Sequence, residues 1–336
     1  MLITFESFRC RRMDKVQFIS DEDVRAVLKI PDAIQVIEDA LRDCSGEAAK
    51  VIPRFAIRTP NGTYRTMAAS VPGMNVVGSK QGFFTSPDPK SDKQSVMSGE
   101  LTSLYDIKSG ALLALVNSHY LNEARTGASA AVGTKYLSNP DSKNLGIIGS
   151  GLQAKTQLIA HCCVRKIEKV KVYSRRKERR ESFCESVRSL VNVNEIVPVS
   201  SPEEACQDSD IVVEATSSTT PVFDGKSLKQ GTHVTAIGTG IRGARTLDDE
   251  SVHRASVFAL GSKEQALIDG LGDVFHPIMS GFLEWSKVVE IGDVVCGKVP
   301  GRQSSKDITL FKSNGSALYD VAVGKLVYDS LTRSKS

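Results

Sequence analysis

The sequence has few residues of the kinds that hold metals or cross-link chains. Its seven cysteines include no C-x-x-C pair, and neither they nor the five histidines show the spacing of metal ligands. Disulfides are typical of oxidising compartments, whereas unpaired thiols are typical of the cytoplasm. We therefore expect reduced cysteines, no metal site and a cytoplasmic protein.

Long apolar runs and an excess of one charge are also missing. No run approaches the eighteen or so apolar residues of a membrane span, and the first fifteen residues lack the charge order and cleavage site of a secretory signal. The 43 basic residues nearly balance the 39 acidic ones and are interleaved with them, except at residues 175–180. The sequence therefore predicts neither a membrane partner nor a nucleic-acid partner.

What the sequence does contain is an ordinary globular composition and one strong motif. Its 336 residues, 40% of them hydrophobic, suffice for two domains. Residues 145–148 are a short β-type run, residues 149–154 read G-S-G-L-Q-A, and apolar residues then recur at helical spacing up to Cys162. A second β-type run follows at residues 170–173. This order predicts a strand, a glycine turn, a helix and a parallel strand, which is a βαβ unit.

The glycine turn has the form G-x-G-x-x-A of a dinucleotide-binding site. Gly149 would make the tight turn, Gly151 would let a pyrophosphate approach the backbone, and Ala154 would let the helix pack closely on the strand. The N-terminus of that helix offers unpaired N–H groups to phosphates. A glycine turn without a nucleotide is the simpler alternative, but the position between two strands favours a nucleotide site.

The residues after the second strand favour NADP(H). An NAD site usually has an acid there for the ribose hydroxyl, whereas an NADP site needs cations and hydroxyls for the 2′-phosphate. Here Ser174, Arg175 and Arg176 follow the strand, and the first acid is Glu178. Because guanidinium groups grip phosphate through paired donors, we predict NADP(H), with NAD(H) as the second choice. A solvated basic loop is the alternative without a cofactor.

The rest of the chain predicts a Rossmann domain inserted in a second domain. Helices are expected at residues 20–29, 31–44, 120–137 and 315–331. Further strands are expected at residues 54–58, 63–68, 76–81, 101–106, 112–117, 196–199, 211–215, 233–237, 256–260 and 308–312. The predicted fold class is α/β. A Rossmann NADP-binding domain of residues 121–312 is inserted in a β-rich α+β domain of residues 1–120 and 313–336, which serves substrate binding and dimerisation.

Several segments, in this order along the chain, resemble one family. They are Pro53-Arg54, Gly78-Ser79-Lys80, residues 123–128 (EARTGA), the GSGLQA turn, Ala236-Ile237-Gly238 and residues 309–331. Together they resemble the ornithine cyclodeaminase and mu-crystallin family over nearly the whole chain after about residue 17. Residues 173–178 (YSRRKE) and the closing segment are especially similar to the mu-crystallin branch, whose members are NADPH-dependent ketimine reductases.

This resemblance implies a homodimer that transfers hydride between a nicotinamide and the Cα of a small imino or amino acid. Guanidinium forks bind carboxylates, and the family positions imply Arg54 and Arg125 for the substrate carboxylate, with Arg65 as a further candidate. Lys80 is implied as a substrate-binding and catalytic residue, because an ammonium in an apolar strand is costly unless it is paired or used. The cofactor-binding residues expected from the motif and the family are Arg125, Thr126, Gly149, Ser150, Gly151, Leu152, Gln153, Ala154, Ser174, Arg175, Arg176, Thr216, Ile237, Gly238 and Asn314.

Each cation also has a purely structural explanation. A salt bridge to Glu123 or a nearby acid is the alternative for Arg125. An exposed strand face is the alternative for Arg54 and Arg65, and the solvated side of an edge strand is the alternative for Lys80. Two loops, residues 86–99 and 269–285, are expected to shape the pocket for the substrate side chain. His119 and His161 are expected to be structural.

One position departs from the family pattern. The cyclodeaminases and alanine dehydrogenases of the family have an aspartate two residues after the glycine that corresponds to Gly238, and this chain has Gly240 there. The mu-crystallin branch lacks that aspartate too. We therefore predict a ketimine reductase or an amino-acid dehydrogenase. The alternatives are an ornithine cyclodeaminase, in which NAD is catalytic, and a non-enzymatic, crystallin-like protein that binds NADPH; Arg175 and Arg176 argue against the first, and the intact Lys80 and Arg125 against the second.

Overall fold

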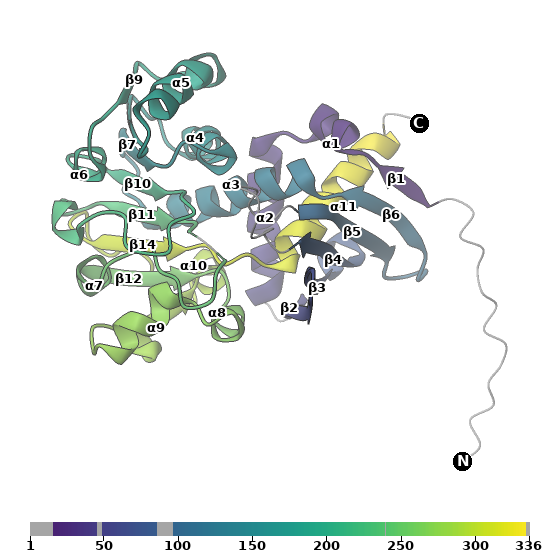
Figure 1. The fold of residues 1–336 in the computed structure, drawn as a ribbon. Coiled ribbons are helices and arrows are strands. Elements are labelled where there is room, and N and C mark those ends of the chain that lie inside the picture. The colour runs from purple at the N-terminus through teal and green to yellow at the C-terminus, as the bar shows by residue number, and fades with distance from the viewer. Residues whose placement is uncertain (1–15, 46–48, 86–96, 239, 334–336) are drawn as a thin grey trace, which may run out of the picture.

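Two β-sheets lie side by side in the computed structural model, with helices packed around and between them (Figure 1). The structure describes residues 16–45, 49–85, 97–238 and 240–333. Across these ranges no helix is both long and apolar enough to cross a membrane. The predicted α/β fold is confirmed.

The larger sheet is parallel throughout and contains the predicted βαβ unit, which is β7, α4 and β8. Its order is β13 (Val288–Glu290), β12 (Ala255–Leu260), β14 (Ile308–Lys312), β11 (His233–Ala236), β10 (Ile211–Glu214), β7 (Asn144–Ile148), β8 (Lys169–Tyr173) and β9 (Glu195–Pro198). Strand order reverses between β7 and β10, since the chain runs outward through β8 and β9 on one side and through β11 on the other. In such sheets ligands bind beyond the carboxyl ends of the strands at this reversal.

The smaller sheet is mostly antiparallel. Its order is β1 (Gln17–Ile19), β6 (Leu112–Asn117), β5 (Met97–Asp106), β4 (Val76–Thr85), β3 (Gly62–Val71) and β2 (Lys50–Thr59), with only β1 and β6 parallel. Side chains alternate between two faces. The inner face packs against α11 (Ala317–Arg333). Large apolar side chains are exposed on the outer face, namely Ile52, Phe55, Ile57, Val77 and Tyr105.

Helices of small residues hold the two sheets together. α3 (His119–Leu137) is buried along most of its length and packs on α2 (Ile30–Ser45), α4 (Leu152–Val164) and α11. A side chain on Gly127 of α3 would press on Thr156 of α4, which explains the small residues there. The remaining helices are α1 (Asp21–Val27), α5 (Lys177–Val187), α6 (Pro202–Cys206), α7 (Asp249–His253), α8 (Lys263–Asp269), α9 (Gly272–Met279) and α10 (Ile291–Val295).

The chain passes from the large sheet back to the small one through residues 313–316. β14 and α11, both yellow in Figure 1, are neighbours in the sequence. β14 belongs to the large sheet, whereas α11 packs on the small one. This crossing agrees with an inserted dinucleotide-binding unit; the domain boundaries at residues 120 and 312 stay a prediction. Two short strands, β1 and β13, were not expected from the sequence, because three residues are too few to show a period.

Candidate functional site

Two guanidinium groups converge on the backbone of Gly315, in the link between the sheets. A methyl group built on Gly315 would lie 3.3 Å from Arg54 Nη2 and 3.6 Å from Arg125 Nη1. Gly315 has φ = +70°, a conformation that glycine adopts without strain. The structure thus brings together two arginines that are 71 positions apart in the sequence, at a point where no side chain fills the space between them.

A bulge in β2 directs Arg54 toward this point. The pairing of β2 with β3 shifts between Ile52 and Phe55, so Arg54 leaves the regular alternation. Its backbone N–H donates to Gln265 Oε1 (2.6 Å), and its Nη1 lies 3.2 Å from Asp269 Oδ2. Both partners belong to α8, so α8 and β2 together fix the guanidinium.

Arg125 is held by two neighbours on helices. Its Nε donates to Asp320 Oδ1 of α11 (3.1 Å), and its Nη2 donates to Asn122 Oδ1, one turn earlier in α3. Glu123 forms no ion pair with Arg125, because residues two positions apart face different sides of a helix. The other structural alternative, a salt bridge to a nearby acid, is present, since Asp320 forms one. The guanidinium is buried, with one edge left toward Gly315.

Lys80 lies in the interior of the small sheet, not at its edge. β4 is flanked by β3 and β5, and Lys80 is 5% exposed on the face that α11 covers. Its Nζ lies 3.0 Å from Glu100 Oε2 and 3.2 Å from Asp320 Oδ1, and donates to Asn122 Oδ1. Lys80 and Arg125 therefore share Asp320 and Asn122. The solvated-edge alternative for Lys80 is wrong.

Arg65 completes the group of cations. Arg65 of β3 and Glu100 of β5 are both paired with Gly82 of β4, which has no side chain to separate them. The Arg65 guanidinium lies 4.6 Å from the centre of the Phe84 ring. Burial, and then the like charge of Arg54, lower the pKa of Arg65. Among the described residues, no carboxylate forms an ion pair with it.

Unsatisfied polar atoms mark the same region. Among the described residues, the buried side-chain atoms without a hydrogen-bond partner include Asp320 Oδ2 and Gln265 Nε2. Each belongs to a residue that contacts Lys80, Arg125 or Arg54. Buried polar atoms are nearly always satisfied in native proteins, by protein or by ligand and water. A polar ligand therefore fits here. We call the residues Arg54, Arg65, Lys80, Glu100, Arg125, Asp269 and Asp320 the cationic chamber.

The dinucleotide motif forms the predicted turn at the strand reversal. Gly149 has φ = +126°, and a side chain there would lie 2.3 Å from the carbonyl oxygen of Ala215, so only glycine fits. Gly151 is the exposed N-cap of α4 and has open space where a side chain would be. No side chain caps α4, and Gln153 Oε1 in its first turn is buried without a partner. These features fit the pyrophosphate of a dinucleotide.

The other expected cofactor residues differ in their exposure and in whether their side chains are already hydrogen-bonded within the protein. Arg175 and Arg176 are exposed beyond β8, as a phosphate contact requires, and Ser174 lies beside them. Thr216 donates both its N–H and its hydroxyl to Glu214, and Thr126 donates its hydroxyl to the backbone of Asn122. The Asn314 side chain makes two hydrogen bonds with the backbone of Ser262. Leu152 is exposed and Ser150 is half-buried. Ala154, in the first turn of α4, is buried.

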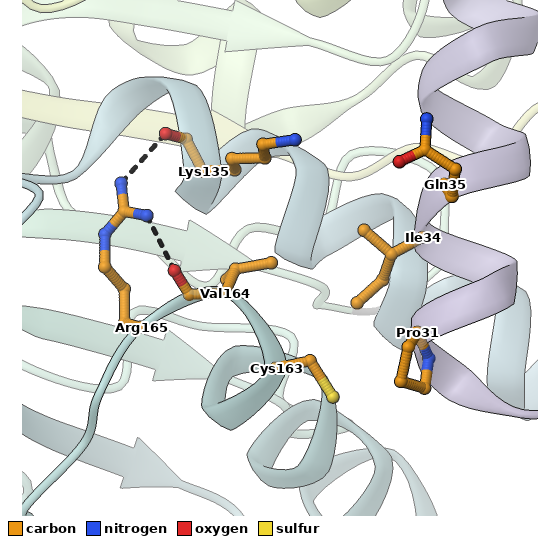
Figure 2. A pocket seen from close by; sticks show the side chains of 7 residues that line it. All are labelled: Pro31, Ile34, Gln35, Lys135, Cys163, Val164 and Arg165. Carbon is orange, nitrogen blue, oxygen red and sulfur yellow. Dashed lines mark hydrogen bonds between the residues drawn. The ribbon is translucent and has the colours of Figure 1, made fainter.

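A separate hollow of about 310 Å³ lies between α2, α3 and the end of α4 (Figure 2). Arg165 on its wall donates to the backbone carbonyls of Val164 and Lys135, as the dashed lines show. Lys135 is paired with Glu38, and burial raises the pKa of Cys163. The charged groups that line this hollow are thus already paired within the protein, so the hollow is not the candidate site.

The fold and these two sites define a class. A parallel sheet with a dinucleotide turn at its reversal, beside a chamber for a small anion, is the architecture of a nicotinamide-dependent oxidoreductase. Residues 14–335 match the model of the ornithine cyclodeaminase/mu-crystallin family, and the chain belongs to that family. The resemblance found in the sequence is confirmed.

Relatives of known activity agree with the class. The chain is 33% identical to a Delta(1)-pyrroline-2-carboxylate reductase of Bacillus cereus, over 93% of this chain and 95% of the relative. The structure of the Thermococcus litoralis Delta(1)-pyrroline-2-carboxylate reductase with NADH and L-proline has a TM-score of 0.87 at 33% identity, covering 95% of this chain and 98% of that one. An archaeal alanine dehydrogenase dimer with bound NAD has a TM-score of 0.86 at 28% identity, covering 96% and 97%.

Sequence reasoning missed the three carboxylates of the chamber. Asp320 had a readable signal, because it is a lone acid among the apolar residues of the closing helix and is 0% exposed. Glu100 and Asp269 had none, since both lie beside polar loop segments in the sequence. The pocket-shaping loop expected at residues 86–99 lies mostly outside the described residues, which resume at residue 97.

Proposed function

We propose that this chain is an NADP(H)-dependent oxidoreductase that reduces a small imino acid, cyclic or linear, or oxidises the matching L-amino acid at Cα. The observation that carries the proposal is the convergence of Arg54 and Arg125 on Gly315 beside the buried Lys80. A planar carboxylate accepts hydrogen bonds from two guanidinium groups at once. We propose that the substrate α-carboxylate binds there.

The charges of the chamber suit one carboxylate. Four cations face three carboxylates, which leaves one positive charge in excess, and a partly buried charge needs a partner. One α-carboxylate would neutralise the chamber. The ammonium of an ornithine side chain would add a second positive charge near Arg65, and Gly240 offers no carboxylate to it. Both facts disfavour the cyclodeaminase alternative.

Lys80 is the proposed catalytic residue. Its ammonium contacts Asp320, which also binds Arg125. It lies between two carboxylates, Glu100 and Asp320, which stabilise its charge. In this position it would donate a proton, or a hydrogen bond, to the substrate C=N group, which makes Cα more electrophilic. Bound NADPH supplies the hydride for Cα.

The preference for NADP(H) rests on the segment after β8. Ser174, Arg175 and Arg176 offer a hydroxyl and two guanidinium groups, and no acid is available for a ribose hydroxyl before Glu178. The structures compared above hold NADH or NAD, which supports a nicotinamide and leaves the phosphate preference as our proposal.

The outer face of the small sheet is proposed as a homodimer interface in a cytoplasmic enzyme. Its apolar residues are Ile52, Phe55, Ile57, Val77 and Tyr105, all on one face. An apolar face of this kind is rare on a monomer, and the archaeal alanine dehydrogenase is a dimer. We propose no nucleic-acid or membrane partner.

The test follows the oxidation of NADPH and of NADH at 340 nm, with pyrroline-2-carboxylate, piperideine-2-carboxylate, and pyruvate plus amines as substrates. The expected result is oxidation with at least one imine, faster with NADPH. No oxidation with any imine, together with proline formed from ornithine and NAD, would establish the cyclodeaminase instead. Binding of NADPH without either reaction would establish the non-enzymatic alternative.

A further inference from the structure

A second buried charge cluster lies under the carboxyl ends of the central strands, apart from the cationic chamber. Glu214 ends β10 and Lys312 ends β14, and both stand in register with Ala236 at the end of β11. Asp273 of α9 reaches the same place. The exposed fractions of Glu214, Asp273 and Lys312 are 0%, 2% and 1%.

Lys312 connects this cluster to the turn after β11. Its Nζ lies 2.8 Å from Asp273 Oδ2 and donates to the carbonyl oxygen of Ile237 (3.2 Å), one residue beyond the strand. A carbonyl at that position has no ladder partner and needs a donor. The next residue, Gly238, has φ = +61°, and a side chain on it would lie 2.1 Å from Lys312 Nζ. The ammonium therefore lies directly against the Ile237–Gly238 turn.

The two carboxylates fix the segments on either side. Asp273 Oδ1 accepts from the backbone N–H groups of Thr246 (2.6 Å) and Leu247 (2.9 Å). Glu214 Oε2 accepts from the hydroxyl of Thr246 (2.8 Å), and Glu214 Oε1 accepts from the N–H of Thr216 (2.8 Å). The cluster thus connects the ends of β10 and β14 with the turn after β11, with α9 and with the segment of Thr246 and Leu247.

Buried charges are an expensive way to fill a core. Replacement of a buried ion pair by apolar residues is often neutral or stabilising, so general stability does not explain three ionisable groups at one edge of this sheet. That edge is the crevice in which this fold class binds its dinucleotide. The turn at Gly238 forms part of the crevice wall, and its shape depends on Lys312.

We propose that Lys312 is a positioning residue for the nicotinamide half of the cofactor, acting through the Ile237–Gly238 turn. Asp273 holds the ammonium, and Glu214 holds Thr216 and Thr246 beside it. The inference rests on the proposed function, because it takes the cofactor to be a nicotinamide dinucleotide. It predicts that the cluster affects the nicotinamide half and not the 2′-phospho-ADP-ribose part, which we expect at Gly149, Gly151 and Arg175.

The experiment compares the Kd of NADPH with the Kd of 2′-phospho-ADP-ribose, which lacks the nicotinamide, for wild type and for Lys312→Met. We expect NADPH binding to weaken roughly tenfold, the worth of one hydrogen bond to a charged group, while the Kd of the fragment stays within about twofold. Lys306→Met changes an exposed lysine just before the other end of β14 and should change neither Kd.

Two further variants keep the test decisive if Lys312→Met does not fold. Glu214→Gln preserves the shape of the side chain but removes its charge, and Gly238→Ala places a methyl group against Lys312 Nζ and so displaces the ammonium from the turn. Both should weaken NADPH selectively. An equal change for NADPH and the fragment, or no change in folded variants, would overturn the inference while leaving the proposed function intact. Wild-type protein that binds neither ligand would overturn both.

Discussion

Arg54 and Arg125 come from a strand and a helix of different layers, yet both reach within 4 Å of the side-chain position of Gly315. Because Arg54 is half-buried and its partner Asp269 is partly exposed, it can be replaced with less damage to the fold than Arg125. It is therefore the better probe of the carboxylate site.

We expect Arg54→Met to raise the KM for the imino acid roughly 10- to 100-fold, the worth of one or two hydrogen bonds to a charged group. The Kd of NADPH should not change. Steady-state kinetics and fluorescence titration measure the two quantities. Arg58→Met, an exposed arginine of the same strand, is the matched control. An unchanged KM for Arg54→Met would remove this residue from the substrate site.

Lys80 holds two buried carboxylates, so its loss should affect stability as well as turnover. Lys80→Met should lower the free energy of unfolding by roughly 3–5 kcal/mol, because Glu100 and Asp320 lose their shared cation. Adding Glu100→Gln should recover part of that loss, since one carboxylate is then neutral, but should not recover kcat. Urea unfolding and kinetics on both variants test this. Recovery of kcat together with stability would show that Lys80 is only structural.

The segment after β8 should decide the choice of cofactor. Arg175→Ala with Arg176→Ala should reduce kcat/KM for NADPH by roughly 10- to 100-fold and leave NADH nearly unaffected, since only the 2′-phosphate contacts are removed. Lys166→Ala, exposed beyond the far end of α4, controls for the loss of surface charge. Equal losses with both cofactors would contradict the phosphate assignment.

Stability should fall in mild acid because of His161. Complete burial lowers the pKa of His161 from 6.5 to about 4, and its Nδ1 must donate to the carbonyl of Gln157 while Nε2 accepts from the hydroxyl of Thr134. Between pH 6.5 and 4 the unfolded chain binds a proton that the folded chain does not, so the stability present above pH 6.5 is lost as the pH falls.

This loss amounts to roughly 3 kcal/mol for His161 alone. Urea unfolding of wild type and His161→Gln at pH 7, 5.5 and 4.5 measures it, and the variant should lose less stability over that range. Burial, and then the charge of His161, lower the pKa of His233, so part of the difference between the two proteins comes through His233. Parallel pH profiles would show that His161 is protonated in the folded state.

The outer sheet face should control assembly. Phe55→Glu with Ile57→Glu places two charges in the proposed interface, where they would be desolvated. Wild type should elute at twice the 36.3 kDa mass of the chain in light-scattering chromatography, and the variant at that mass. Leu190→Glu makes the same kind of change at an exposed leucine outside the small sheet, in the turn after α5. A dimeric double variant would place the interface elsewhere.

Local patterns sufficed for much of the fold. The turn from Gly149 to Ala154 could be predicted because Gly149, Gly151 and Ala154 each have a local requirement for small size. The helices predicted to begin at residues 20 and 31 are α1, whose N-cap is Ser20, and α2, which begins at Ile30. These features depend on neighbours within a few residues.

The sequence by itself determined the fold class and the dinucleotide turn, because the small residues of that turn meet local requirements. The cations Arg54, Lys80 and Arg125 were implied by the resemblance to the family, and their roles stay a prediction. Only the tertiary structure decided their partners. Asp320 lies 240 positions from Lys80 and joins it only when α11 packs on β4. Lys312 and Asp273 form an ion pair between the end of β14 and α9, 39 positions apart, and Glu214, 98 positions from Lys312, is aligned with it through the register of β10, β11 and β14. Charge pairing over such separations depends on how the sheets and helices assemble, which no local pattern records.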